Sequence, residues 1–311
     1  MKDKRKLARH GEAGTGRGGE GTTFSAPPAS ASLSPHLSSF IPHPSSFPLV
    51  AVDIGNHRIK CGLFPSASSD TLPEPSRALT IGACGSELDR LGVTLKDFPP
   101  AASWWIGSVN RPGATRLVDW LRSRRPEDRV RLLAAGDLPL RVALERPDMV
   151  GIDRLLDALA ADRLRRPKCA AVVVDVGSAI TVDLVSEEGV FLGGSILPGI
   201  GMSAQALHTF TDLLPLVEMS ELEDPPPALG TSTVAAMQSG LFWGAVGAIR
   251  QLIAELSGGR PERCDVFLTG GAGPAVAALL GPSARYVPHL TLAGIALAAR
   301  HQAAERPPAS P

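Results

Sequence analysis

The chain has 311 residues, with 31 basic and 31 acidic side chains. Its formal charge is zero, so the total does not favour a nucleic acid or an acidic membrane surface as a partner. Hydrophobic residues make up 44% of the chain, enough to bury the core of two domains or of one large domain. No apolar run reaches the roughly 20 residues that a membrane span requires.

Cysteine usage predicts a reducing, cytoplasmic environment. The chain contains Cys61, Cys84, Cys169 and Cys264, which lie far apart and form no Cys-x-x-Cys pair. This spacing argues against structural zinc and favours free thiols.

Residues 1–48 differ in composition from the rest of the chain. Serine and proline dominate the stretch from Ser25 to Pro48, which follows a start rich in Lys, Arg and Gly. Such a segment cannot bury enough apolar area to offset the entropy lost on ordering. We therefore expect residues 1–48 to be a disordered low-complexity tail, and residues 306–311 to be a second one. A targeting peptide and a misassigned start codon both remain open for the leader.

One short pattern occurs twice along the chain. Val52-Asp53-x-Gly55-Asn56 and Val174-Asp175-x-Gly177-Ser178 each place an aspartate after an apolar run, a glycine two residues later, and a small polar residue next. A second apolar run follows in both copies, which predicts two hairpins. The repetition indicates a duplicated, strand-rich α/β unit, with domains expected at residues 49–168 and 169–305.

The chemistry of this pattern fits a phosphate site. Each aspartate arrives at the C-terminal end of a buried strand, where open α/β sheets place ligands. Glycine lets the backbone approach a ligand closely, so the N–H groups of Gly177 and Ser178 are able to point at phosphate oxygens. Asp53 and Asp175 would repel phosphates unless a cation or ordered water lies between them. A single Asp-x-Gly is most often an ordinary hairpin turn, but two copies in one register favour the phosphate site.

The predicted elements follow the same order in both halves. In the first half we expect strands at Leu49 to Ile54, Ile59 to Phe64, Leu79 to Ile81, Trp104 to Val109 and Val130 to Leu133, with helices around Ser86 to Leu91, from Pro112 and from Ile152. In the second half we expect strands at Ala171 to Asp175, Ile180 to Val185, Val190 to Ile196, Cys264 to Leu268 and Arg285 to Val287. The helices expected there are a stretch that starts at Pro198-Gly199 and contains Ala204 to Phe210, one from Thr231 or Ser232 to Leu256, a short one after Gly271, and one from Leu290 to about Ala304.

Six motifs in one order carry a family resemblance. They are Asp53-Ile-Gly-Asn56, Gly151-Ile-Asp-Arg154, Asp175-Val-Gly-Ser178, Gly193-Gly-Ser-Ile-Leu-Pro-Gly199, Gly230-Thr-Ser-Thr233 and Thr269-Gly-Gly271. From Leu49 to about Ala299 the chain resembles the type III pantothenate kinases, members of the superfamily of actin, hexokinase and heat-shock chaperone ATPases. The resemblance implies an α/β fold of duplicated ribonuclease-H-like (actin-like ATPase) domains with a nucleotide cleft between them.

The resemblance also implies an activity. Type III pantothenate kinases transfer the γ-phosphoryl group of ATP to pantothenate, giving 4'-phosphopantothenate in the first step of coenzyme A biosynthesis. Asp175 matches the family's ligand for a monovalent cation, K⁺ or NH₄⁺, and Mg²⁺ is expected to be held through Asp53 or its water. The residues that match ATP contacts are Asp53, Ile54, Gly55, Asn56, His57, Arg58, Ile59, Lys60 and Ser178.

The substrate residues follow from the same resemblance. Gly151, Ile152, Asp153 and Arg154 match the pantothenate-binding segment, with Asp153 as the proton acceptor. Thr233 matches a contact to pantothenate across the interface of a homodimer. Arg154 is able to anchor a substrate carboxylate or to orient Asp153, and the sequence leaves both roles open. The ordinary alternative for this motif is a helix-starting carboxylate with an exposed salt bridge.

Some positions depart from the family pattern or have a plainer interpretation. His57 replaces the usual Thr, Ser or Asn, Ser178 replaces Thr, and Leu144 stands where many members have tyrosine. Lys60 reaches a phosphate or lies on a solvated sheet edge. The glycines of Thr269-Gly-Gly271 approach the nucleoside or make a tight turn.

Two other functions stay open at this point. One is a kinase or phosphatase of the same superfamily that acts on another small alcohol or phosphate. The other is a regulatory accessory factor. The three motif carboxylates Asp53, Asp153 and Asp175 are all present, which favours the kinase.

Overall fold

The computed structural model describes residues 48–65, 71–83, 87–88, 91–92, 101–219, 224–260 and 263–304. All of them lie in one unit, His43–Pro311. The tails expected at 1–48 and 306–311 lie outside the described residues, apart from Pro48, and so does most of the helix expected around Ser86 to Leu91.

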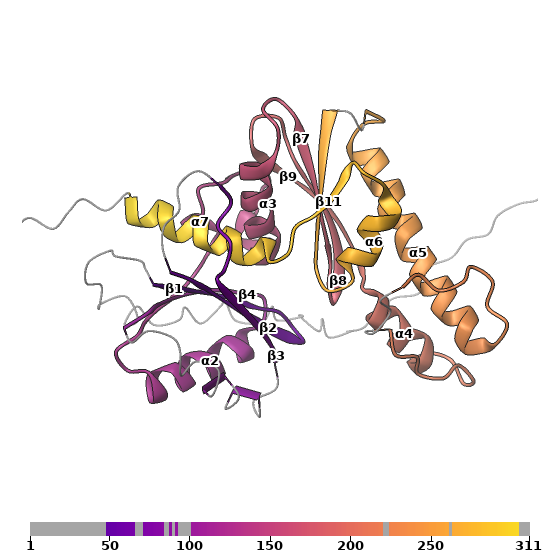
Figure 1. The fold of residues 1–311 in the computed structure, drawn as a ribbon, viewed down its shortest axis with the longest axis horizontal. Helices are drawn as coiled ribbons and strands as arrows, with labels where there is room; N and C mark the ends of the chain where they lie inside the picture. Colours follow the sequence, from indigo (N-terminus) through magenta and orange to yellow (C-terminus); the bar gives the residue numbers. More distant parts are fainter. Residues whose placement is uncertain are drawn as a thin grey trace, which may run out of the picture. The chain divides into compact units, whose positions relative to one another are not determined.

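The first half of the chain forms a sheet with the strand order β3-β2-β1-β4-β5 (Figure 1). The first three strands of this order are antiparallel neighbours, whereas β4 and β5 run parallel to β1. The bounds are Leu49–Ile54 for β1, Arg58–Phe64 for β2, Arg77–Gly82 for β3, Ser103–Ser108 for β4 and Arg129–Leu132 for β5.

The second sheet repeats this topology. Its order is β11-β10-β7-β8-β9-β6, and without β6 the strands follow the first sheet in both order and direction. The predicted fold class, a duplicated ribonuclease-H-like unit, is therefore confirmed. The bounds are Arg141–Val142 for β6, Ala170–Val176 for β7, Ala179–Val185 for β8, Val190–Pro198 for β9, Cys264–Thr269 for β10 and Ala284–Tyr286 for β11.

Strand β6 was not expected, because the sequence from Gly136 to Gly151 reads as a loop. Its two residues are too few to show an alternating pattern, and short 3-10 turns flank it at Ala135–Asp137 and Pro147–Met149. β6 joins the second sheet by pairing in parallel with β9. The domain division between residues 168 and 169 stays a prediction.

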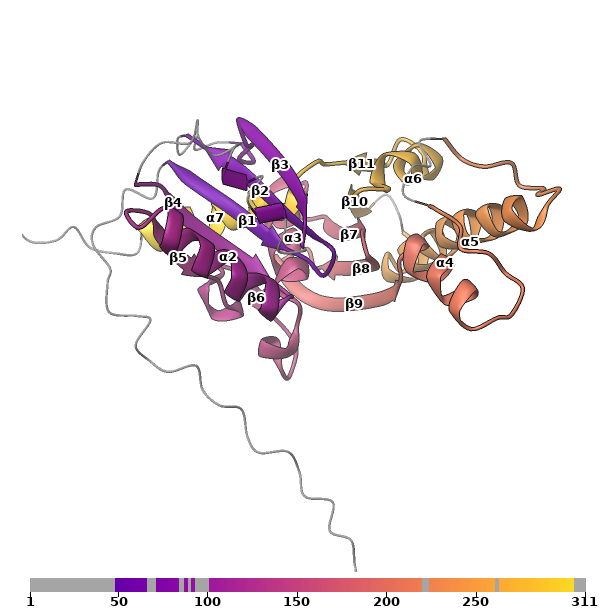
Figure 2. The ribbon, with the colours of Figure 1, turned by 90° about the horizontal axis from the view of Figure 1, so that it is seen from below.

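The helices lie in three layers around the two sheets (Figures 1 and 2). Helix α2 (Arg111–Arg124) packs on one face of the first sheet, and α3 (Ile152–Leu164) and α7 (Leu290–Ala304) share a core with the other face and with the second sheet. Helices α4 (Ile200–Thr209), α5 (Thr233–Leu256) and α6 (Gly273–Leu280) belong to the core on the remaining face of the second sheet. None of the helices in the described ranges has the length and apolar content for a membrane crossing.

The central strands β1 and β7 are buried on both faces. In β1, Leu49 and Ala51 belong to the core around α3 and α7, whereas Val50 and Val52 belong to the core under α2. β7 repeats this alternation between the core around α3 and α7 and the core with α5. Two rigid strands thus carry Asp53 and Asp175 to corresponding ends of the two sheets. Trp104 and Trp105 are buried, as expected for core residues.

Candidate functional site

The first phosphate turn connects β1 to β2. The N–H of Gly55 donates to the carbonyl of Arg58 at 2.9 Å, which closes the turn, and Asn56, His57 and Arg58 are exposed. Asn110, the N-cap of α2, donates from Nδ2 to the carbonyl of Gly55 at 3.2 Å. The sequence analysis missed Asn110, although its position just before Arg111-Pro112 is a typical N-cap signal.

The second turn connects β7 to β8 and is supported by a neighbouring glycine. The N–H of Gly177 donates to the carbonyl of Ala179 at 3.0 Å, and the N–H of Gly199 donates to the carbonyl of Ser178 at 3.2 Å. A Cβ on Gly199 would lie 2.3 Å from that carbonyl oxygen. Glycine is therefore required at position 199, because the backbone there packs closely under the second turn.

A hydrogen bond joins the two turns directly. His57 Nδ1 lies 2.9 Å from Ser178 Oγ, although the two residues are 121 positions apart in the sequence. The structure thus brings the two copies of the sequence repeat face to face. A phosphate that bound to the Ser178 hydroxyl would compete with the imidazole for it.

The glycines after β10 pack against the second turn. Gly270 has a φ of 91°, and a Cβ there would lie 2.3 Å from Asp175 Oδ1 and 2.5 Å from the carbonyl oxygen of Val176. The tight turn expected for Thr269-Gly-Gly271 is therefore present, and it lies beside Asp175. Arg58 Nη1 would be 3.5 Å from a Cβ on Gly271, so the first turn also reaches this point.

Asp53 and Lys60 face each other across the first hairpin. They are paired in the strand register, and Lys60 Nζ lies 3.7 Å from Asp53 Oδ2. The solvated-edge interpretation of Lys60 is wrong, because β2 lies between β1 and β3. Burial raises the pKa of Asp53 to about 7, even though the Lys60 charge opposes the shift.

Two further carboxylates, each with a buried Oδ1 atom, lie near this pair. Asp157 is one helical turn after Asp153 on α3, and neither its Oδ1 nor the Oδ1 of Asp175 has a hydrogen-bond partner among the described residues. Burial raises the pKa of Asp175 to about 6. Burial, and then the charge of Asp175, raises the pKa of Asp157 well above its ordinary value. The sequence analysis missed Asp157, whose only signal was its spacing from Asp153.

These carboxylates would be more stable with bound cations than in the protein alone. An unpartnered buried carboxylate oxygen, such as Asp175 Oδ1, is costly unless a proton or a cation neutralises it. Within the described residues, no group of three or more His, Cys, Asp or Glu side chains forms a ready metal cage.

The Gly151-Ile-Asp-Arg154 motif begins α3 directly beside these charges. Asp153 lies in the first turn of the helix, and its Oδ1 accepts a hydrogen bond from the N–H of Arg154 at 2.8 Å. A Cβ on Gly151 would lie 2.5 Å from the same oxygen, so glycine leaves room for the carboxylate. Burial raises the pKa of Asp153, opposed by the Arg154 backbone N–H and side-chain charge and by Lys60.

Arg154 forms a buried ion pair with Asp183, which the sequence analysis did not single out. Their side chains are 14% and 3% exposed, respectively. The alternative interpretation of Gly-x-Asp-Arg, a motif with an exposed salt bridge, is therefore wrong.

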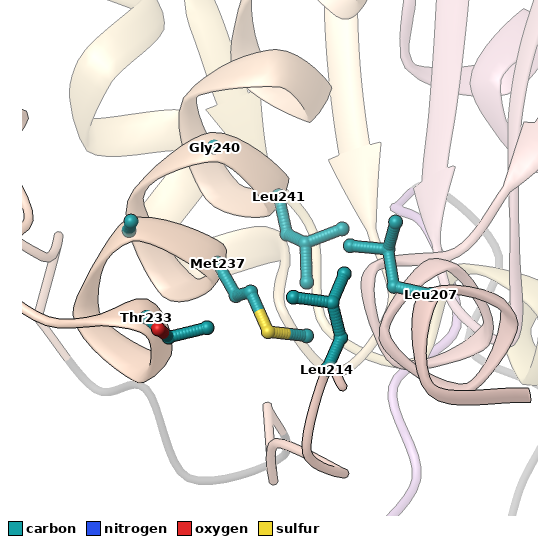
Figure 3. Close-up of a pocket in the computed structure, with 7 residues that line it drawn as sticks. Leu207, Leu214, Thr233, Met237, Gly240 and Leu241 are labelled. Carbon is teal, nitrogen blue, oxygen red and sulfur yellow. The ribbon is translucent and has the colours of Figure 1, made fainter. Parts of the chain in front are cut away.

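Thr233 lies on a different element from the other predicted site residues. As the first residue of α5, it lines an apolar groove of 470 Å³ (Figure 3). The other residues of the groove come from α4, the segment after it, and α5: Leu207, Leu214, Ala236, Met237, Gly240 and Leu241.

Comparison with known proteins agrees with the duplicated sheets and their motifs. The sequence profile of the family described as type III pantothenate kinase matches residues 49–255. The chain belongs to the type III pantothenate kinase family. A type III pantothenate kinase of Anaeromyxobacter dehalogenans (strain 2CP-C) is 34% identical over 252 residues, which are 79% of this chain and 96% of that protein.

A second relative and one solved structure illustrate the range of similarity. The type III pantothenate kinase of Dehalococcoides mccartyi (strain CBDB1) is 32% identical over 263 residues, covering 79% of this chain and 93% of the relative. A putative 2-dehydro-3-deoxygalactonokinase from Sinorhizobium meliloti is 16% identical, with a TM-score of 0.46, and covers 82% of this chain and 99% of its own.

The raised pKa values in this type III pantothenate kinase predict a pH-dependent stability. The pKa of Asp53 rises from 3.8 to about 7 on folding, so the folded protein binds more protons than the unfolded chain between roughly pH 4 and pH 7. The free energy of unfolding attributable to Asp53 therefore falls as the pH rises through this range. Thermal unfolding without nucleotide or divalent cation should show a shallower pH dependence for Asp53→Asn than for the wild type.

The matched control is Asp119→Asn on α2, whose side chain is 66% exposed and pairs only loosely with Arg122 at 3.7 Å. This variant should keep the wild-type pH dependence. Equal slopes for Asp53→Asn and the wild type would contradict the raised pKa of Asp53.

Proposed function

We propose that this chain transfers the γ-phosphoryl group of ATP to the primary hydroxyl of pantothenate, the first step of coenzyme A biosynthesis. Family membership supports the reaction. The observation that carries the proposal is the position of Asp153. It is a half-buried carboxylate at a helix N-terminus that interacts electrostatically with Lys60 and Asp53 of the first phosphate turn.

We assign phosphate binding to the two turns. Phosphoryl transfer depends mainly on positioning and on neutralising charge on the triphosphate. Lys60 supplies a positive charge, and the first-turn residues Asp53 to Lys60 and Ser178 surround the place where the phosphates would lie. Bound Mg²⁺, held through Asp53 or its water, would neutralise part of the triphosphate charge.

Asp153 is the proposed proton acceptor. The pantothenate hydroxyl must lose its proton as its oxygen bonds to phosphorus, and a positioned carboxylate accepts that proton. The N–H of Arg154 fixes one oxygen of Asp153 at 2.8 Å, which orients the carboxylate. Gly151 leaves room for this orientation, and Ile152 is buried in the core beside it.

Asp175 is the proposed ligand of a monovalent cation, K⁺ or NH₄⁺. Support comes from its Oδ1 atom, which is buried and has no hydrogen-bond partner among the described residues. We also propose a cytoplasmic location, because Cys61, Cys169 and Cys264 form no disulfide within the described residues.

The direct test follows ADP formation by the purified protein with Mg²⁺ and ATP, with and without pantothenate, in potassium and in sodium buffer. We expect turnover that requires pantothenate and is faster in potassium. No pantothenate-dependent turnover in either buffer would overturn the proposed function and favour another alcohol as acceptor. Equal pantothenate-dependent rates in the two buffers would remove only the potassium assignment.

Replacing the proposed base tests its role. Asp153→Asn keeps the size of the side chain but removes its ability to accept a proton, so kcat should fall by about 10²- to 10⁴-fold. Binding of Mg²⁺-ATP, measured by calorimetry, should change little. Asp148→Asn is the control, because Asp148 pairs with Arg146 in an exposed ion pair shortly before α3. Wild-type kcat for Asp153→Asn would exclude it as the base.

We further propose that the protein is a homodimer that pairs through the face formed by α4 and the start of α5. Several large apolar side chains on this face are exposed, including Phe210 at 84% and Leu213 at 87%. Leu207 of α4 and Leu214 of the segment after it line the groove together with Thr233 (Figure 3). A Cβ added at Gly240 or Gly244 of α5 would meet no atom within 4 Å, so this side of the helix is free to pack closely against a second copy.

Sedimentation analysis of the wild type should therefore give the mass of two chains. Phe210→Ser with Leu213→Ser should shift the protein towards the monomer and lower pantothenate-dependent turnover, because Thr233 would lose its place beside the partner's site. Met149→Ser is the control, since Met149 is 73% exposed on a 3-10 turn before α3. A monomeric wild type with full activity would overturn the dimer.

A further inference from the structure

The guanidinium group of Arg154 is held inside the protein through its Nε and Nη2 atoms. Its Nε donates to both carboxylate oxygens of Asp183, at 3.2 and 3.1 Å, and its Nη2 also donates to Asp183. The guanidinium carbon lies 5.6 Å from the centre of the Phe191 ring, so the ring covers one face of the cation. Arg154 is therefore clamped from β8 and β9, and its fork already holds a carboxylate.

The backbone of the second sheet is built to accommodate Asp183. Asp183 pairs in register with Gly194 of β9. A Cβ on Gly194 would lie 2.5 Å from Asp183 Oδ1 and 2.1 Å from the carbonyl oxygen of Val182, so no larger residue fits there. A hydrogen bond from the Thr181 side chain also stabilises the Asp183 carboxylate. This explains why the motif beginning Gly193-Gly194 accompanies the site, although it contributes no side chain at Gly194.

The same arginine connects this clamp to the proposed base. Arg154 follows Asp153 in the first turn of α3, and its backbone N–H is the donor that holds Asp153 Oδ1 at 2.8 Å. The N-cap Gly151 makes no side-chain cap hydrogen bond, so the start of α3 has no cap of the usual kind. The Arg154 side chain instead ties this turn to β8 through Asp183.

We propose that Asp183 is a positioning residue, which acts through Arg154 to fix the first turn of α3 and so to orient the Asp153 carboxylate for proton transfer. The guanidinium of Arg154 is then not the anchor of the substrate's carboxylate. The inference deepens the proposed function and rests on the assignment of Asp153 as base. It also decides between the two roles that the sequence left open for Arg154.

The two roles predict opposite effects of Asp183→Asn, which keeps the side-chain shape but removes the charge. If Asp183 positions the base, kcat falls by about 10- to 100-fold, as expected for a reacting group displaced by a fraction of an ångström or more, while KM for pantothenate changes little. If Arg154 instead anchors the substrate, the released guanidinium binds pantothenate more tightly, so KM falls and kcat is retained.

Steady-state kinetics of four variants test the proposal: Asp183→Asn, Asp183→Glu, Arg154→Gln, and Asp183→Asn combined with Arg154→Gln. We expect Asp183→Glu to recover part of kcat, because it keeps the charge. The double variant should lose no more than the worse single variant, since both changes remove the same interaction. It also leaves no unpaired buried charge, so it reports on the proposal even where Asp183→Asn alone folds poorly.

Asp162→Asn serves as the control, because it breaks another Arg–Asp pair of α3, that of Arg165 Nε and Asp162 Oδ1 at 2.6 Å. This variant should keep the wild-type kcat. Two results with an active wild type would overturn the positioning role while the proposed function stands. One is a wild-type kcat for Asp183→Asn, and the other is a double variant in which the losses of the two single variants simply add. A wild type without pantothenate-dependent turnover overturns the proposed function itself, and the positioning role with it.

Discussion

Buried negative charge is the constraint on which the rest of this site depends. Asp53, Asp157 and Asp183 are buried and Asp175 is half-buried with a buried Oδ1 atom, in a region where an ionised carboxylate is stable only if it is paired, hydrogen-bonded or neutralised by a bound cation. Asp183 forms an ion pair with Arg154, and Asp53 Oδ2 lies 3.7 Å from Lys60 Nζ. Asp157 and Asp175 keep an oxygen without a protein partner among the described residues. Bound cations would neutralise the remaining negative charge.

The duplicated sheets make this concentration of charge possible. Because β1 and β7 are buried on both faces, their ends cannot move away from the repulsion between the aspartates that they carry. Glycines then let other backbone segments close around the carboxylates. Gly270 approaches Asp175, Gly194 approaches Asp183, and Gly151 makes room for Asp153. These glycines contribute no reactive side chain, but they are as necessary to the site as the carboxylates that they surround.

Most regular elements were predictable from the sequence because apolar periodicity over five or more residues is a local property. The two hairpins, the long helix capped by Ser232 and the final helix from Leu290 lie where their patterns place them. Strand β6 was missed because two residues carry no period. The edge interpretation of Lys60 was wrong because the pairing of β3 with β2 is set by the whole sheet and leaves no trace in the sequence around Lys60.

The sequence by itself determined the duplicated hairpins, the family motifs and the motif carboxylates Asp53, Asp153 and Asp175, since each depends on residues that are close together in the chain. Only the tertiary structure decided which side chains from distant parts of the sequence come into contact. It paired Arg154 with Asp183, 29 residues away, and His57 with Ser178, 121 residues away. It also placed Asp157 under the site and Asn110 behind the first turn. These pairings follow from strand register and from the packing of α3 between the two sheets, which local sequence patterns do not encode.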